Sequence, residues 1–307
     1  MTSATASAAA ADTRRGILMM LAGMSLFTFN DALGKWLVSD YPVAMLLAIR
    51  SLFGAVLLAP LIAREGLRAV FAVKRLPLHL MRVVCVTCEV ACFYWAVRHL
   101  PLANVMTIYM AAPLIVTALS VPLLGETVGW RRWVAVLVGF AGVVVVLNPA
   151  GDFDALPSLV ALLGTVIFAT GMVATRLLRE SSNLTLVSYQ TFGTGLVGAA
   201  SAPLVWVPPS GIDFLLLGAL GVTSLLGHAA MNRSLQLSPA ATVVPFQYVS
   251  ILWAVALDLA VWDTAPSLRI ALGALLIIGS GLFVFHREQT LNRGVAAEAN
   301  SGLGPGS

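Results

Sequence analysis

The sequence predicts an all-α integral membrane protein whose ten transmembrane helices form two inverted five-helix repeats around a central cavity. Three observations predict this fold: few charged residues, ten apolar runs of spanning length, and matches between the two halves. Of the 307 residues, 59% are hydrophobic and only 10% are charged, whereas about 25% are charged in a soluble domain. A chain so poor in charge lacks a polar shell, so lipid must form part of its surroundings.

Turn residues divide the chain into ten apolar runs. Each run has about the 20 residues that a helix needs to cross a bilayer. Backbone groups in hydrocarbon must bond within their own segment, which favours helices. The breaks hold turn dipeptides such as Asn148-Pro149 and Ser238-Pro239. The predicted spans are 16–38, 43–63, 78–98, 101–123, 130–148, 157–177, 184–206, 212–232, 239–262 and 268–286.

Both ends of the chain read as tails. Residues 1–13 are rich in Ala, Ser and Thr, which indicates disorder. A signal peptide is not expected, because no small-residue cleavage site follows and nine more spans come after the first. The predicted organisation is a disordered cytoplasmic tail over 1–15, repeats over 16–149 and 150–286, and a cytoplasmic tail over 287–307.

Basic residues flank the spans unevenly, which predicts their orientation. With the N-terminus in the cytoplasm, fourteen of the 18 Lys and Arg residues lie on the cytoplasmic side. Three lie outside, namely Lys35, Arg98 and Arg269, and Arg50 lies within a span. Cytoplasmic loops carry an excess of Lys and Arg, so we expect both termini in the cytoplasm.

The two halves of the chain match at an offset of 137 residues. Tyr109 falls on Phe246, Glu126-Thr127 on Asp263-Thr264, and Gly142 on Gly279. Because each half has five spans, an odd number, the second half must be inverted relative to the first. Inverted repeats are typical of transporters, in which the substrate site lies near the midplane.

Polar and aromatic residues inside the spans are the candidate binding residues. A charge at mid-bilayer costs several kcal/mol, so such groups face a cavity or a partner. We expect a cavity lined by the first, third, sixth, eighth and ninth spans. The candidates are Asn30, Glu89, Trp95, Tyr109, Tyr189, His228, Asn232, Gln247 and Tyr248.

Other roles remain open for these residues. Glu89 and His228 are also candidates for proton coupling, and any polar candidate could instead only hold helices together. Trp95 could belong to the aromatic belt at the membrane surface. Arg50 is expected in a buried ion pair, and Asp258, one turn from the outer end, could reach the headgroups.

The composition of the cavity bears on its cargo. Aromatic faces bury apolar groups and attract cations, so the site suits amino acids or similar amphipathic metabolites. The sequence predicts no catalytic residue, cofactor or metal site: Cys85, Cys88 and Cys92 share one span without a histidine and read as packing residues. Nucleic acid is not expected, because basic residues do not cluster on one face. The expected partners are a small-molecule substrate and the bilayer, and a monomer is plausible.

One long stretch carries a family resemblance. It comprises Leu100-Pro101-Leu102-Ala103, Ala112-Pro113-Leu114, Leu124-Gly125-Glu126, a basic pair, and a Gly-rich run ending Val146-Leu147-Asn148-Pro149. This order resembles the first repeat of the EamA family in the drug/metabolite transporter superfamily, most closely its YddG-type bacterial amino-acid and metabolite exporters. Arg50 and Tyr94-Trp95-Ala96 also fit, whereas Trp262-Asp263 replaces the Gly-Glu pair in the second repeat.

The resemblance implies ten helices around a central cavity, export by alternating access, and a location in the bacterial inner membrane. Alternative functions are a multidrug, cation or nucleobase exporter of the same fold, or a passive channel. Proton coupling and facilitated diffusion are both compatible with the sequence.

Overall fold

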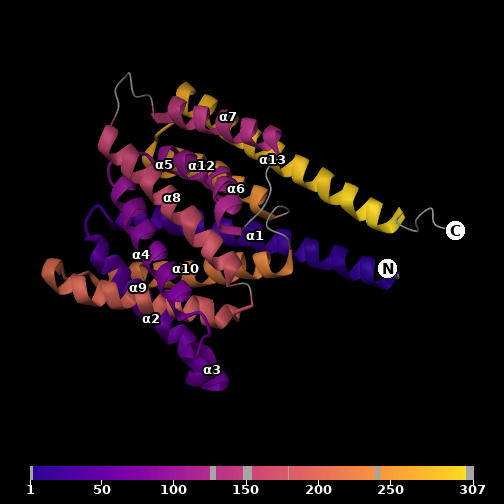
Figure 1. Cartoon of the computed structure of the whole chain (residues 1–307). Helices are drawn as coiled ribbons and strands as arrows, with labels where there is room; N and C mark the ends of the chain where they lie inside the picture. Colours follow the sequence, from indigo (N-terminus) through magenta and orange to yellow (C-terminus); the bar gives the residue numbers. More distant parts are fainter. Residues whose placement is uncertain (1–2, 125–128, 148–153, 179, 239–242, 302–307) are drawn as a thin grey trace.

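The computed structural model describes residues 3–124, 129–147, 154–178, 180–238 and 243–301, and every regular element in them is helical (Figure 1). Two are 3₁₀ turns, η1 (Ala202–Val205) and η2 (Val244–Tyr248). The α-helices are α1 (Ser3–Leu37), α2 (Val43–Glu65), α3 (Leu67–Phe71), α4 (Leu76–Val97), α5 (Leu102–Tyr109), α6 (Ala112–Leu124), α7 (Trp130–Leu147), α8 (Ala155–Leu177), α9 (Asn183–Ser201), α10 (Gly211–Leu237), α12 (Val249–Trp262) and α13 (Leu268–Ser301).

The helices confirm the prediction of a membrane protein. Six segments are long and apolar enough to cross a bilayer, namely Asp12–Leu37, Val43–Glu65, Leu76–Val97, Leu102–Leu119, Ala155–Leu177 and Gly211–Leu237. Shorter apolar helices cover Trp133–Leu147, Phe246–Trp262 and Leu268–Phe283. Helix α9 coincides with the seventh predicted run but is more polar than the six segments above. Its buried residues include Ser188, Gln190 and Thr194.

The fourth predicted span contains a turn, although Leu102–Leu119 is apolar enough to cross a bilayer, and the tails continue the terminal helices. The run 101–123 forms two helices, α5 and α6, with a turn at Met110 and Ala111. Pro113 follows this turn and lacks the N–H that an unbroken helix would need there. The predicted tails are helical from Ser3 and as far as Ser301, because their alanine-rich sequences favour helix.

Helices from the two halves of the chain pair with one another. Helix α1 packs on α10, α2 on α9, α4 on α8, and α7 on α13, and Figure 1 shows α7 and α13 side by side along one edge. Gly142 and Gly273 lie in close contact, which lets α7 and α13 pack closely against each other. The small side chains of Cys85 and Cys92 face α8 glycines, but Cys88 is exposed rather than buried.

The paired helices run antiparallel. Along α2, Leu47 and Ala48 contact Gly198, whereas Gly54, further along α2, contacts Thr191 at an earlier position of α9. On α7 and α13, Gly139 faces Ser280 while Gly142, further along α7, faces Gly273 at an earlier position of α13. The second spans of the two halves therefore run in opposite directions, and so do the fifth spans.

Glycines hold α2 tightly between α9 and α10. A Cβ atom on Gly221 would meet the backbone carbonyl of Arg50, and one on Gly198 would meet the backbone between Leu47 and Ala48. Backbone atoms cannot rotate away as a side chain can, so these two glycines set how closely α2 packs. They also fix the position from which the Arg50 side chain extends.

A buried ion pair ties three helices together at one end of the bundle. Lys35 Nζ on α1 lies 2.9 Å from Asp258 Oδ1 on α12 and 4.1 Å from the ring centroid of Trp262. The same carboxylate accepts the backbone N–H groups of Leu102 at 3.3 Å and Ala103 at 2.6 Å, at the start of α5. Asp258 is 1% exposed, so the expectation that it reaches the headgroups was wrong.

A second polar contact lies at this end of the bundle, between α1 and α10. The Tyr41 hydroxyl, in the connection after α1, donates to the Asp213 carboxylate at 2.7 Å. This bond requires the protonated phenol, so it raises the pKa of Tyr41 above its ordinary value. The connection is thereby anchored to the first turn of α10.

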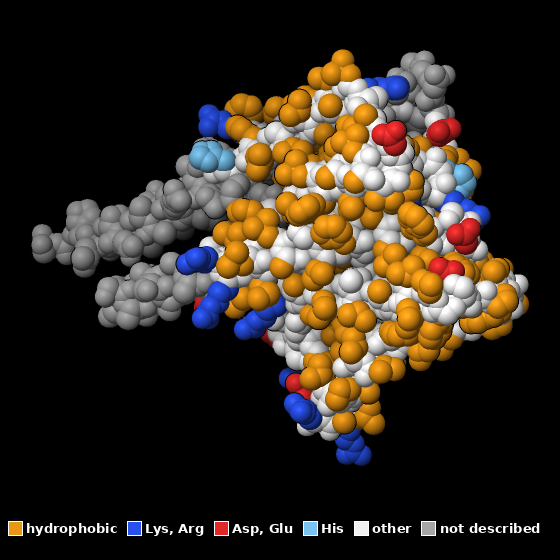
Figure 2. All heavy atoms as spheres, turned by 180° about the vertical axis from the view of Figure 1, so that it is seen from behind, with side chains coloured by type: hydrophobic (Ala, Val, Ile, Leu, Met, Phe, Trp, Pro, Cys, Tyr) orange, Lys and Arg blue, Asp and Glu red, His pale blue; other side chains and the backbone are white. Residues whose placement is uncertain are grey.

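The molecular surface agrees with a protein that spans a membrane. Figure 2 shows a broad hydrophobic belt, with most of the visible Lys and Arg near the edge from which the terminal helices project and most Asp and Glu at the opposite edge. The beginning of α1 and the end of α13 project on the same side (Figure 1).

We predict that Gly221→Ala lowers stability by about 1–3 kcal/mol, the usual cost of overpacking a close contact. Gly279→Ala is the matched control, because nothing lies within 4 Å of a Cβ there and both sites lie within helices. Thermal unfolding in detergent measures both, and equal midpoints for the two variants would contradict the close-packing argument.

We predict that Asp258→Asn destabilises the protein by about 3 kcal/mol, because it leaves the Lys35 ammonium buried without its counter-charge. Asp263→Asn, at an exposed position on the same helix end, should have little effect. Adding Lys35→Met to Asp258→Asn should restore part of the loss. A double variant less stable than Asp258→Asn alone would refute the ion pair as the cause.

Candidate functional site

A central cavity lies between the two halves of the bundle. It contains about 720 Å³ of space not filled by atoms and is lined from α1, α2, α4, α5, α8, α10, η2 and α12. The predicted first, third, sixth, eighth and ninth spans all contribute, and α2 and α5 join them. Its charged lining residues are Asp31, Arg50 and Glu89, and its aromatic residues are Phe27, Phe93, Tyr94, Tyr109 and Phe168.

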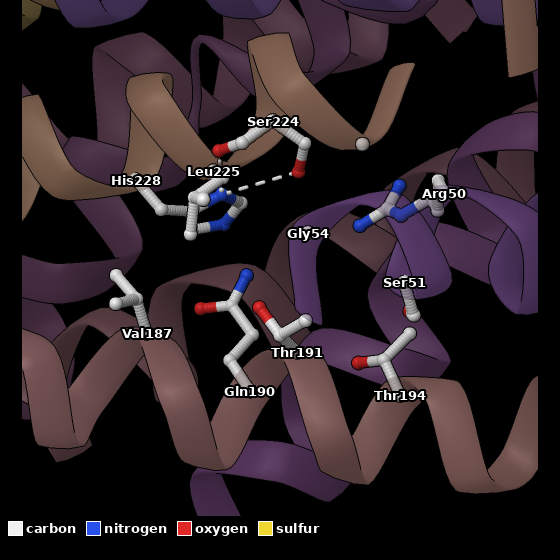
Figure 3. Close-up of a pocket in the computed structure, with 11 residues that line it drawn as sticks. Arg50, Ser51, Gly54, Val187, Gln190, Thr191, Thr194, Ser224, Leu225 and His228 are labelled. Carbon is white, nitrogen blue, oxygen red and sulfur yellow. Dashed lines mark hydrogen bonds between the residues drawn. The ribbon is translucent and has the colours of Figure 1, made fainter. Parts of the chain in front are cut away.

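Two smaller hollows adjoin this cavity and share residues with it. One, of about 320 Å³, lies between α2, α9 and α10, where Gln190, Thr191 and Thr194 face Ser224 and His228 (Figure 3). The other, of about 390 Å³, lies between α4, α8 and α10. His228 lines all three spaces and therefore stands where they meet.

Five of the nine predicted binding residues line the central cavity: Asn30, Glu89, Tyr109, His228 and Gln247. Asn30 is already engaged, since its Nδ2 donates to Leu220 O at 2.8 Å and Thr223 Oγ1 at 2.7 Å. Its Oδ1 accepts the Tyr94 hydroxyl at 3.3 Å. These bonds join α1, α4 and α10, so Asn30 holds the bundle together beside the cavity.

The other four predicted residues lie outside the lining of these three spaces. The Trp95 ring packs on His99, with centroids 4.4 Å apart. Tyr189 donates to Phe71 O at 2.7 Å, near α3. Asn232 donates to Asn183 Oδ1 at 3.1 Å, and Tyr248 packs against Gly281 of α13. All four contact neighbouring helices or loops, which the sequence could not distinguish from the cavity.

The hydrogen bond of His228 defines its tautomer. Its Nδ1 lies 2.8 Å from the carbonyl oxygen of Ser224, one helical turn earlier. A carbonyl can only accept, so Nδ1 must carry the proton. The ring stands edge-on to Phe27 at 4.5 Å. The Nε2 atom then carries no proton and can accept a hydrogen bond.

The three charged residues of the cavity are not paired. Asp31 interacts electrostatically with Glu89 and Arg50, and Glu89 with Arg50. No N···O distance of 4.0 Å or less joins Arg50 to either carboxylate in the described chain. The buried ion pair expected for Arg50 is therefore absent there, and space separates the opposite charges.

The sequence interpretation missed Asp31. From the first predicted span, Asn30 was chosen as a candidate and the acidic residue beside it was passed over. Asp31 is four residues from Phe27 and three from Gly34, so it belongs to the same face. An acidic residue within an apolar run of spanning length was the signal that could have found it.

A second buried arginine has its own acceptors. Arg82 on α4 is 2% exposed and donates to Thr175 Oγ1 at 2.7 Å, Leu186 O at 3.0 Å and Gln190 Oε1 at 3.1 Å. These acceptors belong to α8 and α9. Arg82 thus joins α4 to α8 and α9, and together with Glu89 it lines the hollow between α4, α8 and α10.

Two hydroxyl groups at the cavity lack partners. Tyr109 Oη and Ser250 Oγ are buried, and neither has a hydrogen-bond partner among the described residues. Both residues line the cavity and are 7% and 1% exposed. A buried polar group without a bond is costly, so each hydroxyl is suited to bonding a bound molecule or water.

Comparison with known proteins assigns the family. The model of the EamA-like transporter family matches the chain twice, over residues 14–148 and 156–286. The chain belongs to the EamA-like transporter family. The match covers both halves and confirms the resemblance seen in the sequence. This EamA protein is therefore a membrane transporter and not an enzyme.

Relatives of this EamA transporter are named for different cargoes. It is 24% identical over 277 residues to an S-adenosylmethionine uptake transporter of Rickettsia prowazekii, covering 89% of this chain and 93% of the relative. It is 26% identical to a riboflavin transporter of Vibrio cholerae, covering 91% and 95%. It is also 26% identical to a pseudopaline exporter of Pseudomonas aeruginosa, covering 86% and 94%.

A solved crystal structure shares the fold of this EamA transporter. The two superpose with a TM-score of 0.64 over 87% of this chain and 94% of the other, at 20% sequence identity.

We predict unequal effects for two tyrosines of the cavity. Tyr94→Phe should lower stability by about 1 kcal/mol, because it removes the bond to Asn30. Tyr109→Phe should cost less, because its hydroxyl makes no hydrogen bond of ordinary length and only interacts with the nearby Glu89 carboxyl. Thermal unfolding in detergent without substrate measures both, and a larger loss for Tyr109→Phe would contradict this description of the site.

Proposed function

We propose that this EamA transporter exports small amphipathic metabolites with a charged amino group, amino acids among them, by alternating access across the bacterial inner membrane. The observation that carries the proposal is the unpaired set of charges around the cavity. Arg50 and the carboxylates of Asp31 and Glu89 are more than 4 Å apart, in a space bordered by aromatic rings.

A zwitterion placed between these groups would satisfy both signs of charge. The guanidinium of Arg50 offers two parallel N–H donors to a substrate carboxylate. Asp31 and Glu89 offer oxygen acceptors to an ammonium group. The rings of Phe27, Phe93 and Phe168 line the same cavity and would bury an apolar side chain. The free hydroxyl of Tyr109 supplies one more polar contact.

The antiparallel pairing of the helices supports alternating access. The second spans of the two halves, α2 and α9, pack antiparallel, and so do the fifth spans, α7 and α13. This arrangement is what an inverted repeat requires, with the substrate site between the halves near the midplane. Rocking of one half against the other would expose the cavity to each side in turn.

Orientation and domain boundaries are part of this proposal. The beginning of α1 and the end of α13 project on one side (Figure 1), and this projection and the basic edge beside it (Figure 2) support a cytoplasmic location for both ends. The repeats are proposed to cover 16–149 and 150–286. The relatives include one protein named for uptake and one named for export, so the direction of transport rests on the amino-acid exporter resemblance.

Counterflow in proteoliposomes tests the proposal. We expect saturable counterflow of labelled L-phenylalanine, L-methionine or L-leucine against the same unlabelled compound. Arg50→Gln should lower it at least about tenfold, because the substrate carboxylate loses a charge-assisted bond. Arg64→Gln, at the exposed end of the same helix, should leave it unchanged, and Arg50→Lys should keep part of it.

Three other results would each contradict a part of the proposal. Flux without saturation or counterflow would indicate a passive channel. Counterflow of organic cations or nucleobases without any amino acid would keep the transporter class but overturn the substrate class. Equal loss in Arg50→Gln and Arg64→Gln would remove Arg50 from the binding site.

A further inference from the structure

We propose that the carboxyl groups of Asp31 and Glu89 together hold one proton. They release it to water when a substrate of net positive charge binds in the cavity. Organic cations would then exchange for protons, whereas zwitterions would not. This inference rests on the proposed function, because it assumes that the substrate enters this cavity. In this inference, Asp31 and Glu89 are the residues that distinguish organic cations from zwitterions.

The charged residues that line the cavity do not balance. Two carboxylates, Asp31 on α1 and Glu89 on α4, face one guanidinium, Arg50 on α2. With all three ionised, the cavity carries one excess negative charge. Such a charge inside a membrane protein is costly unless something neutralises it. A proton on the carboxylate pair and a cationic substrate are the two groups that can do so.

Other titratable groups near the cavity do not supply the missing positive charge. The guanidinium of Arg82 is bonded to α8 and α9 and is not among the charges that act on Asp31 or Glu89. The ring of His228 on α10 faces both arginines, which repel a positive charge on it. Lys35 is neutralised by Asp258.

The remaining groups are neutral near pH 7. Tyr94 and Tyr109, on α4 and α5, line the cavity, and Cys92 on α4 lies close to Glu89. Phenols and thiols are uncharged at this pH. The lining residues from α8, η2 and α12 are Phe168, Gln247 and Ser250, which do not titrate. The carboxylate pair therefore holds the exchangeable proton.

Independent evidence for a ligand comes from the unpartnered hydroxyls. Ser250 Oγ is buried at the cavity wall and has no hydrogen-bond partner among the described residues, and Tyr109 Oη makes no hydrogen bond of ordinary length there but interacts with the Glu89 carboxyl. They are neutral, so they can bond a polar ligand of either charge class. The cavity thus combines an unsatisfied charge with unsatisfied hydrogen-bonding groups.

One proton leaves the cavity for each monovalent cation that enters. A carboxylic acid of the pair loses its proton to water, and the resulting carboxylate pairs with the cation that enters. The cavity stays neutral with either occupant, so one monovalent cation displaces one proton. A zwitterion adds no net charge, so the pair keeps its proton while the zwitterion bridges Arg50 and the remaining carboxylate.

The test compares two ligands that differ by one carboxylate. Phenylethylammonium is a cation, and L-phenylalanine is the zwitterion with the same ring. Binding to the purified full-length protein in detergent is measured calorimetrically in buffers of different ionisation enthalpy. We expect release of about one proton with the cation, and a Kd that falls about tenfold per pH unit while the pair is protonated. L-Phenylalanine should release none, and its Kd should not depend on pH.

Two variants locate the proton. Asp31→Asn and Glu89→Gln each leave one carboxylate facing Arg50, so the cavity is neutral without a bound proton. In both, proton release should disappear and phenylethylammonium should bind at least about tenfold more weakly. Glu65→Gln, at the exposed end of α2, is the matched control and should behave as the parent. The measurement on the parent protein tests proton release even if a variant does not fold.

The outcomes separate this inference from the proposed function. Binding of phenylethylammonium without proton release, or binding of L-phenylalanine alone, overturns the inference and leaves the proposed function intact. Release of one proton that persists in both variants also overturns it, because another group must then titrate. Failure of both compounds to bind the parent contradicts the proposed function and the inference together.

Discussion

Lipid supplies no partner for a charge, so each ionisable side chain that the bundle buries depends on a partner within the protein. Asp258 meets this constraint with an ammonium group and two backbone N–H groups. Arg82 meets it with three neutral acceptors on two other helices. Asp31, Arg50 and Glu89 do not meet it with one another. Their unpaired charges distinguish the cavity from the rest of the interior.

The positions of the helices could be predicted because hydrophobic length is a direct requirement of the bilayer. Every apolar run in the sequence corresponds to a helix or a pair of neighbouring helices in the described chain. Local backbone chemistry was harder to predict. The break between α5 and α6 before Pro113 depends on one missing N–H, and the helical tails depend on alanine propensity, neither of which changes hydrophobicity.

The candidate site was predictable only in part. The depth of each side chain in the bundle and the rotation of each helix about its axis are set by packing. Glu89 and His228 are ionisable and lie mid-span, so the free-energy cost of exposing a charge to lipid was enough to indicate that they face inward. Tyr189 and Asn232 looked equivalent in the sequence, yet their hydrogen bonds go to Phe71 and Asn183. Asp31 was missed because its neighbour Asn30 was the only candidate chosen from α1.

The carboxylate of Asp258 has a consequence for how the bundle can move. It serves at once as the counter-ion of Lys35 and as the acceptor for the first N–H groups of α5. Separating α1 from α12 would therefore unpair a cation and strain the start of a third helix in the same event. A gradual separation of α1 from α12 is disfavoured, because a small separation breaks the bonds of Asp258 before water can replace them. The arrangement suits a molecule that populates two distinct shapes and spends little time between them.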